Sequence, residues 1–188
     1  MSVALEHLGA DPLDEDALRA FVGPPLEVSF ASLGFDERLV LEAVRVYRQS
    51  YDLLGPPLFP GVLPALQRLR DAGLRLALAT SKPQVLAQEI VSHHEVAPLL
   101  DVVCGAESDH ARSTKAHVVG DALRALGGPS RPVMVGDRFH DVEGAAAHGV
   151  PCIGVLWGYG DAQELTSAGA VALAADVDEL VRLVLGAG

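Results

Sequence analysis

Two kinds of residue are scarce in this chain of 188 residues, and each scarcity argues against a class of protein. Cys104 and Cys152 are the only cysteines, so we expect neither a disulfide framework nor a cysteine-rich zinc site. Basic residues number 14 against 25 acidic ones. The resulting net charge of −11 argues against binding to nucleic acid or to an anionic membrane surface.

Long apolar runs are also lacking. No run in the sequence reaches the length that a membrane-crossing helix needs. The N-terminal residues show no basic stretch followed by an apolar one, so the sequence predicts no signal peptide. From these absences we expect a cytoplasmic protein.

Apolar residues, in contrast, are abundant. They make up 49% of the chain against 21% charged residues, which predicts a globular protein with a hydrophobic core. An acidic protein that binds an anionic substrate needs a local positive site, such as a lysine, a metal ion or a helix N-terminus. The positions of lysines and of carboxylate pairs are therefore the most informative features of this chain.

The periodicity of the chain changes at the segment from Gly55 to Gly61, its strongest break. Before it, apolar residues recur at helical spacing. After it, apolar strand-like runs alternate with amphipathic helical ones, which predicts a parallel sheet with helices on both faces. We expect a helical domain over residues 1–58 and an α/β core domain over residues 59–188, with strands at 74–80, 100–105, 132–136, 152–156 and 171–174.

Two carboxylates follow the apolar run of residues 133–135. Gly136 allows a sharp turn, and Asp137 and Asp141 then stand four residues apart. If a helix begins near Asp141, both acids can face the crevice at the carboxyl ends of the strands, where ligands bind. Two such oxygen anions suit magnesium. The alternative is one N-cap aspartate and one solvated aspartate.

Two further elements are suited to phosphate. Thr80 and Ser81 follow one predicted strand and precede a helix, where hydroxyls and free amides can hold an oxyanion. The alternative is an ordinary N-cap with Pro83 at the first helical position. Lys115 stands at the start of another helix, where the helix dipole disfavours a cation, and this favours an anionic partner. A solvated lysine is the alternative there.

In that order, Thr80, Lys115 and the acid pair resemble three motifs of the haloacid dehalogenase superfamily, within it the phosphoglycolate phosphatase-like branch. In this family the second motif binds phosphoryl oxygens through Thr or Ser. The third supplies a lysine, and the fourth supplies acids that hold Mg²⁺. The resemblance implies that Thr80 and Lys115 are catalytic and bind phosphate together with Ser81. It also implies that Asp137 and Asp141 bind the metal.

The resemblance extends over nearly all of the chain. It implies a Rossmann-like core with an N-terminal helical cap. It also implies a phosphatase that forms an aspartyl-phosphate and acts on a small phosphorylated metabolite such as 2-phosphoglycolate. Gly23, Pro24 and Pro25 resemble part of the substrate-facing loop of the cap. The segment Gly158–Gly160 also resembles this branch.

The first motif of the family, Asp-x-Asp-Gly-Thr after an apolar strand, does not occur in the sequence. Its first aspartate is the nucleophile. Asp14 and Asp16 have the spacing, but no apolar strand precedes them, no Gly-Thr follows, and the segment is typical of a helix start. The resemblance places Met1 within the first cap helix, so we expect either a start assigned too late or a true truncation.

The absent strand is central in this fold, between the strand that ends at Thr80 and the strand that ends before Asp137. We expect these two strands to expose unpaired edges, which makes the chain poorly soluble or defective in folding. Two alternatives are that the strands shift together, or that a second copy fills the gap in a homodimer.

Three other functions stay open at this point. A haloacid dehalogenase proper uses the same nucleophile without metal, but the acid pair favours magnesium. A second alternative is that this chain, truncated and without its nucleophile, is a non-catalytic phosphate-binding or interaction protein. A receiver-like signalling domain also uses an acid, a hydroxyl and a lysine, but its acids come early in the chain and it has no helical cap.

Overall fold

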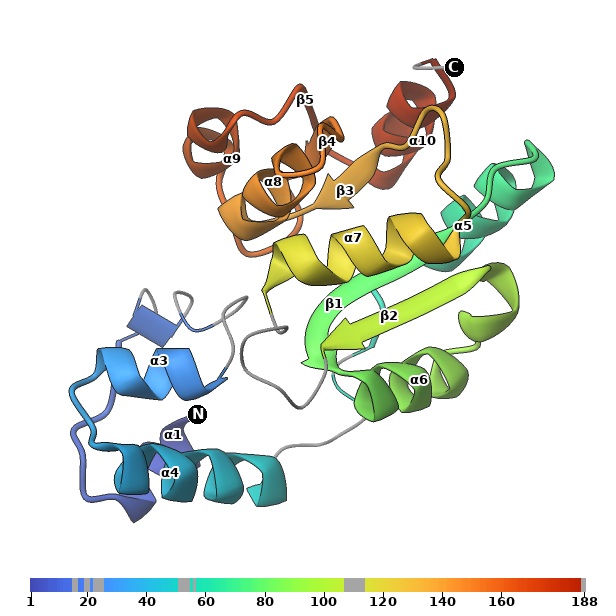
Figure 1. Ribbon diagram of the computed structural model, residues 1–188. Coiled ribbons are helices and arrows are strands. Elements are labelled where there is room, and N and C mark those ends of the chain that lie inside the picture. Colours follow the sequence, from blue (N-terminus) through green and yellow to red (C-terminus); the bar gives the residue numbers. More distant parts are fainter. Residues whose placement is uncertain are drawn as a thin grey trace. The chain divides into compact units, whose positions relative to one another are not determined.

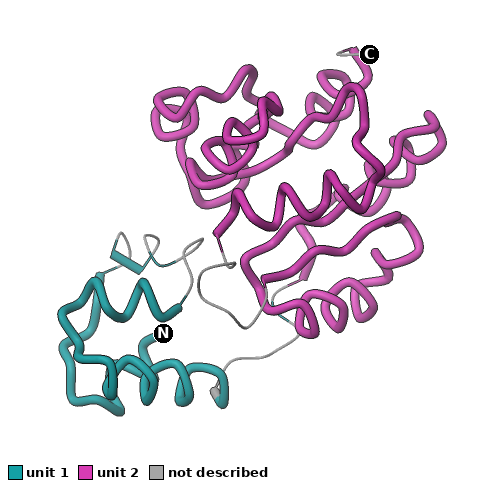
Figure 2. The backbone as a smooth tube through the Cα atoms, in the orientation of Figure 1, with its two compact units in different colours: residues 1–55 teal, residues 56–188 magenta. Residues whose placement is uncertain are grey.

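The computed structural model describes residues 1–14, 17–18, 21, 26–50, 55, 57–106 and 114–186. The chain forms two units, residues 1–55 and residues 56–188 (Figure 2). The predicted domain border, after residue 58, lies close to the border between these units. The role of the first unit as a cap stays a prediction. In the part of the chain that the structure describes, no helix is long and apolar enough to cross a membrane.

The described part of the first unit contains helices α1 (Ser2–His7), α3 (Leu26–Ser32) and α4 (Glu37–Ser50) (Figure 1). Asp36 lies directly before α4, and its Oδ1 accepts the N–H of Leu39 at 2.8 Å. This bond satisfies one of the free amides at the helix start, where the sequence predicts a helix to begin. The unit has one hydrophobic cluster, formed by Ala4, Leu5, Phe30, Val40, Ala43, Val44 and Val46.

Helices and strands alternate in the second unit, as the sequence predicts. Their order is α5 (Val62–Asp71), β1 (Ala77–Pro83), α6 (Gln84–His93), the 3₁₀ turn η1 (Ala97–Leu99), β2 (Val102–Ala106), α7 (Lys115–Ala125), β3 (Met134–Gly136), α8 (Phe139–Ala146), β4 (Cys152–Val155), α9 (Ala162–Ala168), β5 (Ala172–Ala174) and α10 (Val177–Gly186).

The strands form two parallel sheets instead of the one that the sequence predicts. One sheet has the order β1-β2 and the other the order β3-β4-β5. Among the described residues no strand lies between β1 and β3 to carry the hydrogen-bond ladder from one sheet to the other. The two strands have not shifted together to pair, so that alternative is wrong for this structure.

Helices link the two sheets. Helix α7 contacts both β1 and β2 and also packs against α8, and Figure 1 shows it between the first sheet and α8. Helix α5, which leads into β1, packs against α10. A hydrophobic cluster joins these two helices to β4 and β5: Ala65, Leu69, Ile153, Val155, Ala174, Val181 and Val184.

Candidate active site

The carboxyl end of β3 carries the two predicted acids. Asp137 follows the last residue of β3, and Asp141 lies in the first turn of α8. The Oδ2 atom of Asp141 accepts the N–H groups of Asp137 at 3.0 Å and of Arg138 at 3.1 Å. Asp141 is only 7% exposed. Its side chain therefore shapes the turn between β3 and α8, because it satisfies amides that the helix leaves free.

The loop after β4 holds Asp137. The N–H of Tyr159 donates to Asp137 Oδ2 at 2.8 Å. The N–H of Gly160 donates to the backbone oxygen of Asp137 at 2.9 Å. The segment Gly158–Gly160 thus contacts Asp137 through its backbone N–H groups. Tyr159 itself is 46% exposed.

Lys115 contacts both β1 and the helix that follows β3. Its Nζ lies 2.9 Å from Asp141 Oδ1 and donates to the backbone oxygen of Ala79, in β1, at 3.1 Å. The side chain is 16% exposed, so the alternative of a solvated lysine is wrong. Thr114 caps the helix that presents it, because its Oγ1 accepts the N–H of His117. The structure thus brings Lys115, Asp141 and the backbone of β1 at Ala79 together.

Thr80 and Ser81 lie within β1, next to the carbonyl that Lys115 contacts. The Oγ1 atom of Thr80 accepts the N–H of Lys82 at 3.2 Å. Pro83 ends the strand, and α6 begins at the residue after it with no side-chain cap. The alternative of an ordinary Ser/Thr N-cap with proline at the first helical position is therefore wrong. The roles of Thr80 and Ser81 toward phosphate stay predictions.

Glu164 and Arg138 also shape the site, and the sequence does not reveal them. The Oε1 atom of Glu164, in α9, accepts from Arg138 Nε at 2.8 Å and from the N–H of Phe139 at 2.9 Å. Arg138 is only 8% exposed. Because α8 begins at Phe139, this carboxylate fixes the start of the helix that carries Asp141. No local pattern marks the contact, because α9 lies beyond β4 in the chain.

His140 lies between the two acids in the sequence, and its ring contacts Phe139 in the structure. Its ring stacks on Phe139, with 3.7 Å between the ring centroids. Burial and then the positive charge of Arg138 lower the pKa of His140, so its imidazole is neutral at pH 7. A neutral ring adds no positive charge beside the two carboxylates.

The carboxylates fit a magnesium ion unequally. Both oxygens of Asp141 are engaged, one by Lys115 and the other by two N–H groups. Among the described residues only Oδ2 of Asp137 is engaged, which leaves Oδ1 as a metal donor. No group of three or more His, Cys, Asp or Glu side chains in the described part of the chain converges on one point. A magnesium site does not need three protein ligands, since the ion keeps several waters and takes substrate phosphate oxygens alongside one or two carboxylates.

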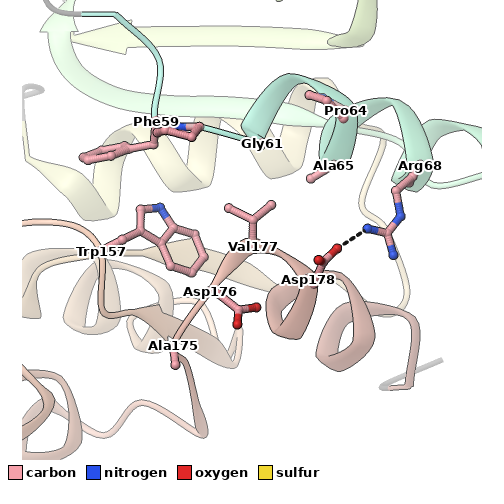
Figure 3. Close-up of a pocket in the computed structure, with 11 residues that line it drawn as sticks. Phe59, Gly61, Pro64, Ala65, Arg68, Trp157, Ala175, Asp176, Val177 and Asp178 are labelled. Atoms are coloured by element: carbon pink, nitrogen blue, oxygen red, sulfur yellow. Dashed lines mark hydrogen bonds and ion pairs between the residues drawn. The ribbon is translucent and has the colours of Figure 1, made fainter.

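A separate pocket of about 580 Å³ lies between the starts of α5 and α10 (Figure 3). Trp157, from the same loop as Tyr159, and Phe59 line it together with Val177. Its cation, Arg68, is paired with Asp178 at 2.6 Å. The pocket is mainly apolar and carries two carboxylates, so it does not suit phosphate.

The cap-loop residues Gly23, Pro24 and Pro25 lie outside the described residues. Their predicted contact with substrate therefore stays a prediction.

The fold and the site define an α/β protein of parallel sheets with a lysine and two carboxylates beside its strands. The chain belongs to the haloacid dehalogenase-like hydrolase family, whose model matches residues 1–155. A named phosphoglycolate phosphatase and a solved structure of a predicted phosphatase are among the proteins to which the chain is similar.

Three comparisons illustrate the relationship. The chain is 43% identical to the tyrosine-protein kinase PtkA of Mycobacterium tuberculosis, over 94% of this chain and 62% of the relative. It is 33% identical to a phosphoglycolate phosphatase of Rhodobacter capsulatus, over 82% of this chain and 74% of the relative. A crystal structure of a predicted phosphatase from Clostridium acetobutylicum matches with a TM-score of 0.90 and 35% identity, over 98% of this chain and 88% of that one.

Proposed function

We propose that this protein is a magnesium-dependent phosphatase that acts on a small, phosphoglycolate-like metabolite. The reaction passes through an aspartyl-phosphate, and its nucleophile is absent from these 188 residues. One observation carries the proposal: Lys115 Nζ lies between Asp141 Oδ1 and the backbone oxygen of Ala79. A largely buried ammonium between β1 and the start of α8 is a local positive site in an acidic chain.

Each site residue has a stated task in this proposal. Lys115, Thr80 and Ser81 bind the phosphoryl oxygens, and Lys115 stabilises charge on the group during transfer. Asp137 and Asp141 would hold the magnesium ion. Asp137 would be the main ligand, because Lys115 and two backbone amides already use the oxygens of Asp141. Magnesium would supply further positive charge to the phosphate oxygens.

Asp14 is the described member of the pair Asp14 and Asp16, which has the spacing of the family's first motif. Asp14 Oδ1 accepts the N–H of Ala17 at 2.8 Å, and its backbone oxygen accepts the N–H of Leu18 at 3.0 Å. This is the geometry of a helix start, as its sequence predicts. Asp16 lies outside the described residues.

The test adds the family's first motif, with its nucleophilic aspartate, to the chain. An apolar strand ending in Asp-x-Asp-Gly-Thr is fused upstream of Met1, and phosphate release from 2-phosphoglycolate is measured with Mg²⁺ and with a chelator. We expect turnover only in the fused protein with Mg²⁺, and loss of turnover when Lys115→Met or Asp137→Asn is introduced. Turnover that survives the chelator, or that the unfused chain also shows, would contradict the proposal.

The same experiment distinguishes the alternatives. Chloride release from a 2-chloro acid by the fused protein without metal indicates a haloacid dehalogenase. Absence of any turnover, together with Mg²⁺-dependent binding of inorganic phosphate, indicates a non-catalytic phosphate-binding protein. The cytoplasmic location and the absence of nucleic-acid and membrane partners stay predictions.

Phosphoryl transfer to protein tyrosine is a second candidate function, which the 43% identity to a tyrosine-protein kinase favours. The chain spans 62% of the length of that relative. In this reaction a tyrosine hydroxyl, instead of water, takes the phosphoryl group at the same site. The measurement is incorporation of phosphate from labelled ATP into a tyrosine-containing polypeptide. Incorporation that is lost in Lys115→Met would support the kinase function. Absence of incorporation would favour the phosphatase function.

A further inference from the structure

The pocket between the starts of α5 and α10 has no part in the proposed function. None of the described candidate site residues lines it, and all of its lining residues belong to the second unit. Its volume of about 580 Å³ lies in the range of small-molecule sites. Figure 3 shows Phe59 and Trp157 at one side of the pocket and the paired Arg68 and Asp178 at the other. The pocket thus has room for a small molecule, with an aromatic side and a charged side.

Two aromatic rings dominate the apolar part of the pocket. Phe59 comes from the segment before α5, and Trp157 comes from the loop after β4. Phe59 is 47% exposed, and Trp157 is partly exposed. The faces of such rings carry partial negative charge, so they attract organic cations as well as apolar groups. The aromatic side therefore suits a ligand that is apolar, cationic or both.

The charged groups of the pocket leave one carboxylate uncompensated. Arg68 pairs with Asp178 at 2.6 Å, so these two charges largely cancel. Asp176 has no cationic partner among the described residues. Its Oδ1 accepts the N–H of Glu179 at 2.8 Å, which leaves Oδ2 for a ligand. The pocket therefore combines aromatic rings with a net negative charge.

Two helices begin at the pocket, and the free N–H groups of a helix N-terminus favour anions. At α10, however, Asp176 already caps the helix, and Asp178 adds an acid to the first turn. At α5, the N–H of Val62 donates to the backbone oxygen of Phe59 at 3.2 Å, and Pro64 has no N–H. Neither helix offers a set of free amides to an anion, so the uncompensated carboxylate determines which charge the pocket favours.

We propose that this pocket is a binding site for a small organic cation with an aromatic body. The cationic group pairs with the carboxylate of Asp176. The aromatic body packs against Phe59 and Trp157, whose ring faces also attract the cation. The net charge of −11 favours the approach of such a ligand. The site is independent of the proposed phosphatase function, because it uses none of the residues that this function needs.

The test uses the 188-residue chain and the fluorescence of Trp157, the only tryptophan in the sequence. The probe is benzyltrimethylammonium. Its neutral analogue, 2-methyl-1-phenyl-2-propanol, has nearly the same shape, and phenylacetate serves as the anion. We expect a saturable change of fluorescence with the cation, and binding about fivefold weaker or less for the two other compounds, because only the cation is attracted by the carboxylate. Isothermal titration calorimetry measures the same three affinities independently of the fluorescence.

A matched pair of variants tests the carboxylate. Asp176→Asn removes the charge but keeps the cap of α10, since asparagine is an equally good N-cap. We expect it to bind the cation about fivefold more weakly and the neutral analogue as before. Asp161→Asn is the control, because Asp161 caps α9 in the same way, accepting the N–H of Glu164 at 2.7 Å, and does not line the pocket. Its affinity for the cation should equal that of the unaltered chain.

A third variant tests the aromatic side. Phe59→Leu keeps an apolar side chain but removes one ring face, so it should weaken binding of the cation about two- to fivefold. Equal affinities for the cation and its neutral analogue, or equal losses in Asp176→Asn and Asp161→Asn, would overturn the cation site. Tighter binding of phenylacetate would overturn it in favour of an anion site. Absence of saturable binding of the cation in both measurements would overturn the pocket as a ligand site.

Discussion

Asp141 is the residue that joins the parts of the site. The sequence predicts it as a metal ligand, but the structure also gives it a positioning role. One oxygen pairs with Lys115 and the other accepts two backbone amides. The same carboxylate therefore sets the turn after β3 and holds the lysine in place.

Replacing Asp141 by Asn should destabilise the chain. The side chains of Asp141 and Lys115 are 9% and 16% exposed, so the change leaves a largely buried ammonium without its carboxylate. We expect a loss of about 3 kcal/mol in the free energy of unfolding, measured in urea. Asp178→Asn is the control, because its pair with Arg68 is exposed and should contribute only about 0–1 kcal/mol. Equal losses in the two variants would contradict this role of Asp141.

Cys152 provides a pH-dependent prediction. Burial, and then the negative charge of Asp141, raise the pKa of the Cys152 thiol from 9.0 to about 12. The unfolded chain loses this proton at lower pH than the folded chain does, so stability should fall as the pH rises from 9.0 toward 12. Urea unfolding across this range measures the fall. The fall should be smaller in Cys152→Ala, and an identical pH profile in that variant would count against the assignment.

At the scale of elements, the site depends on close contact between the β3–α8 turn and the loop after β4. A Cβ atom on Gly136 would overlap the side chain of Asp141, and one on Gly158 would overlap the side chain of Asp137. Both positions therefore need glycine for space, and the two acids are held by contacts that a larger residue would break.

Gly158→Ala should disturb this contact. The added methyl group must displace Asp137, so we expect a loss of about 1–3 kcal/mol, the usual cost of overpacking. The bond from the Tyr159 N–H to Asp137 should weaken as well, which the chemical shift of that amide reports. Gly186→Ala is the matched control, since nothing lies near its added Cβ at the end of α10. A stable Gly158→Ala variant with an unshifted Tyr159 amide would refute the role of this contact.

At the scale of the whole molecule, the divided sheet is the dominant feature. Among the described residues β1 and β3 each have an edge that pairs with no strand, and Val135 of β3 is 38% exposed. Such edges promote association between molecules.

We therefore expect the chain to self-associate as its concentration rises, with light scattering as the measurement. Val135→Lys places a charge on the edge strand β3 and should reduce the scattering, because charged edge residues oppose pairing. Val85→Lys, at a 66% exposed position on α6, should leave the scattering unchanged. A monomer with one sharp thermal unfolding transition at high concentration would contradict the prediction.

The sequence alone determined the order of elements and which residues are candidates for the site. Apolar periodicity depends on local spacing, so it predicted the five strands that the structure describes in the second unit and the helical character of the first. Thr80, Lys115 and Asp137 could be named as candidates because each stands next to the end of a predicted element, and their roles stay predictions. The boundaries at Pro83 and Phe139 could not, because local propensity does not decide whether a strand continues or a helix begins early.

Only the tertiary structure decided what these residues contact. Lys115 meets Ala79 and Asp141, Tyr159 meets Asp137, and Glu164 meets Arg138 across long stretches of chain. No local pattern encodes such contacts, because they depend on how the sheets and helices pack. The division of the sheet was likewise decided in three dimensions, since strand pairing is a relation between segments that are distant in the chain.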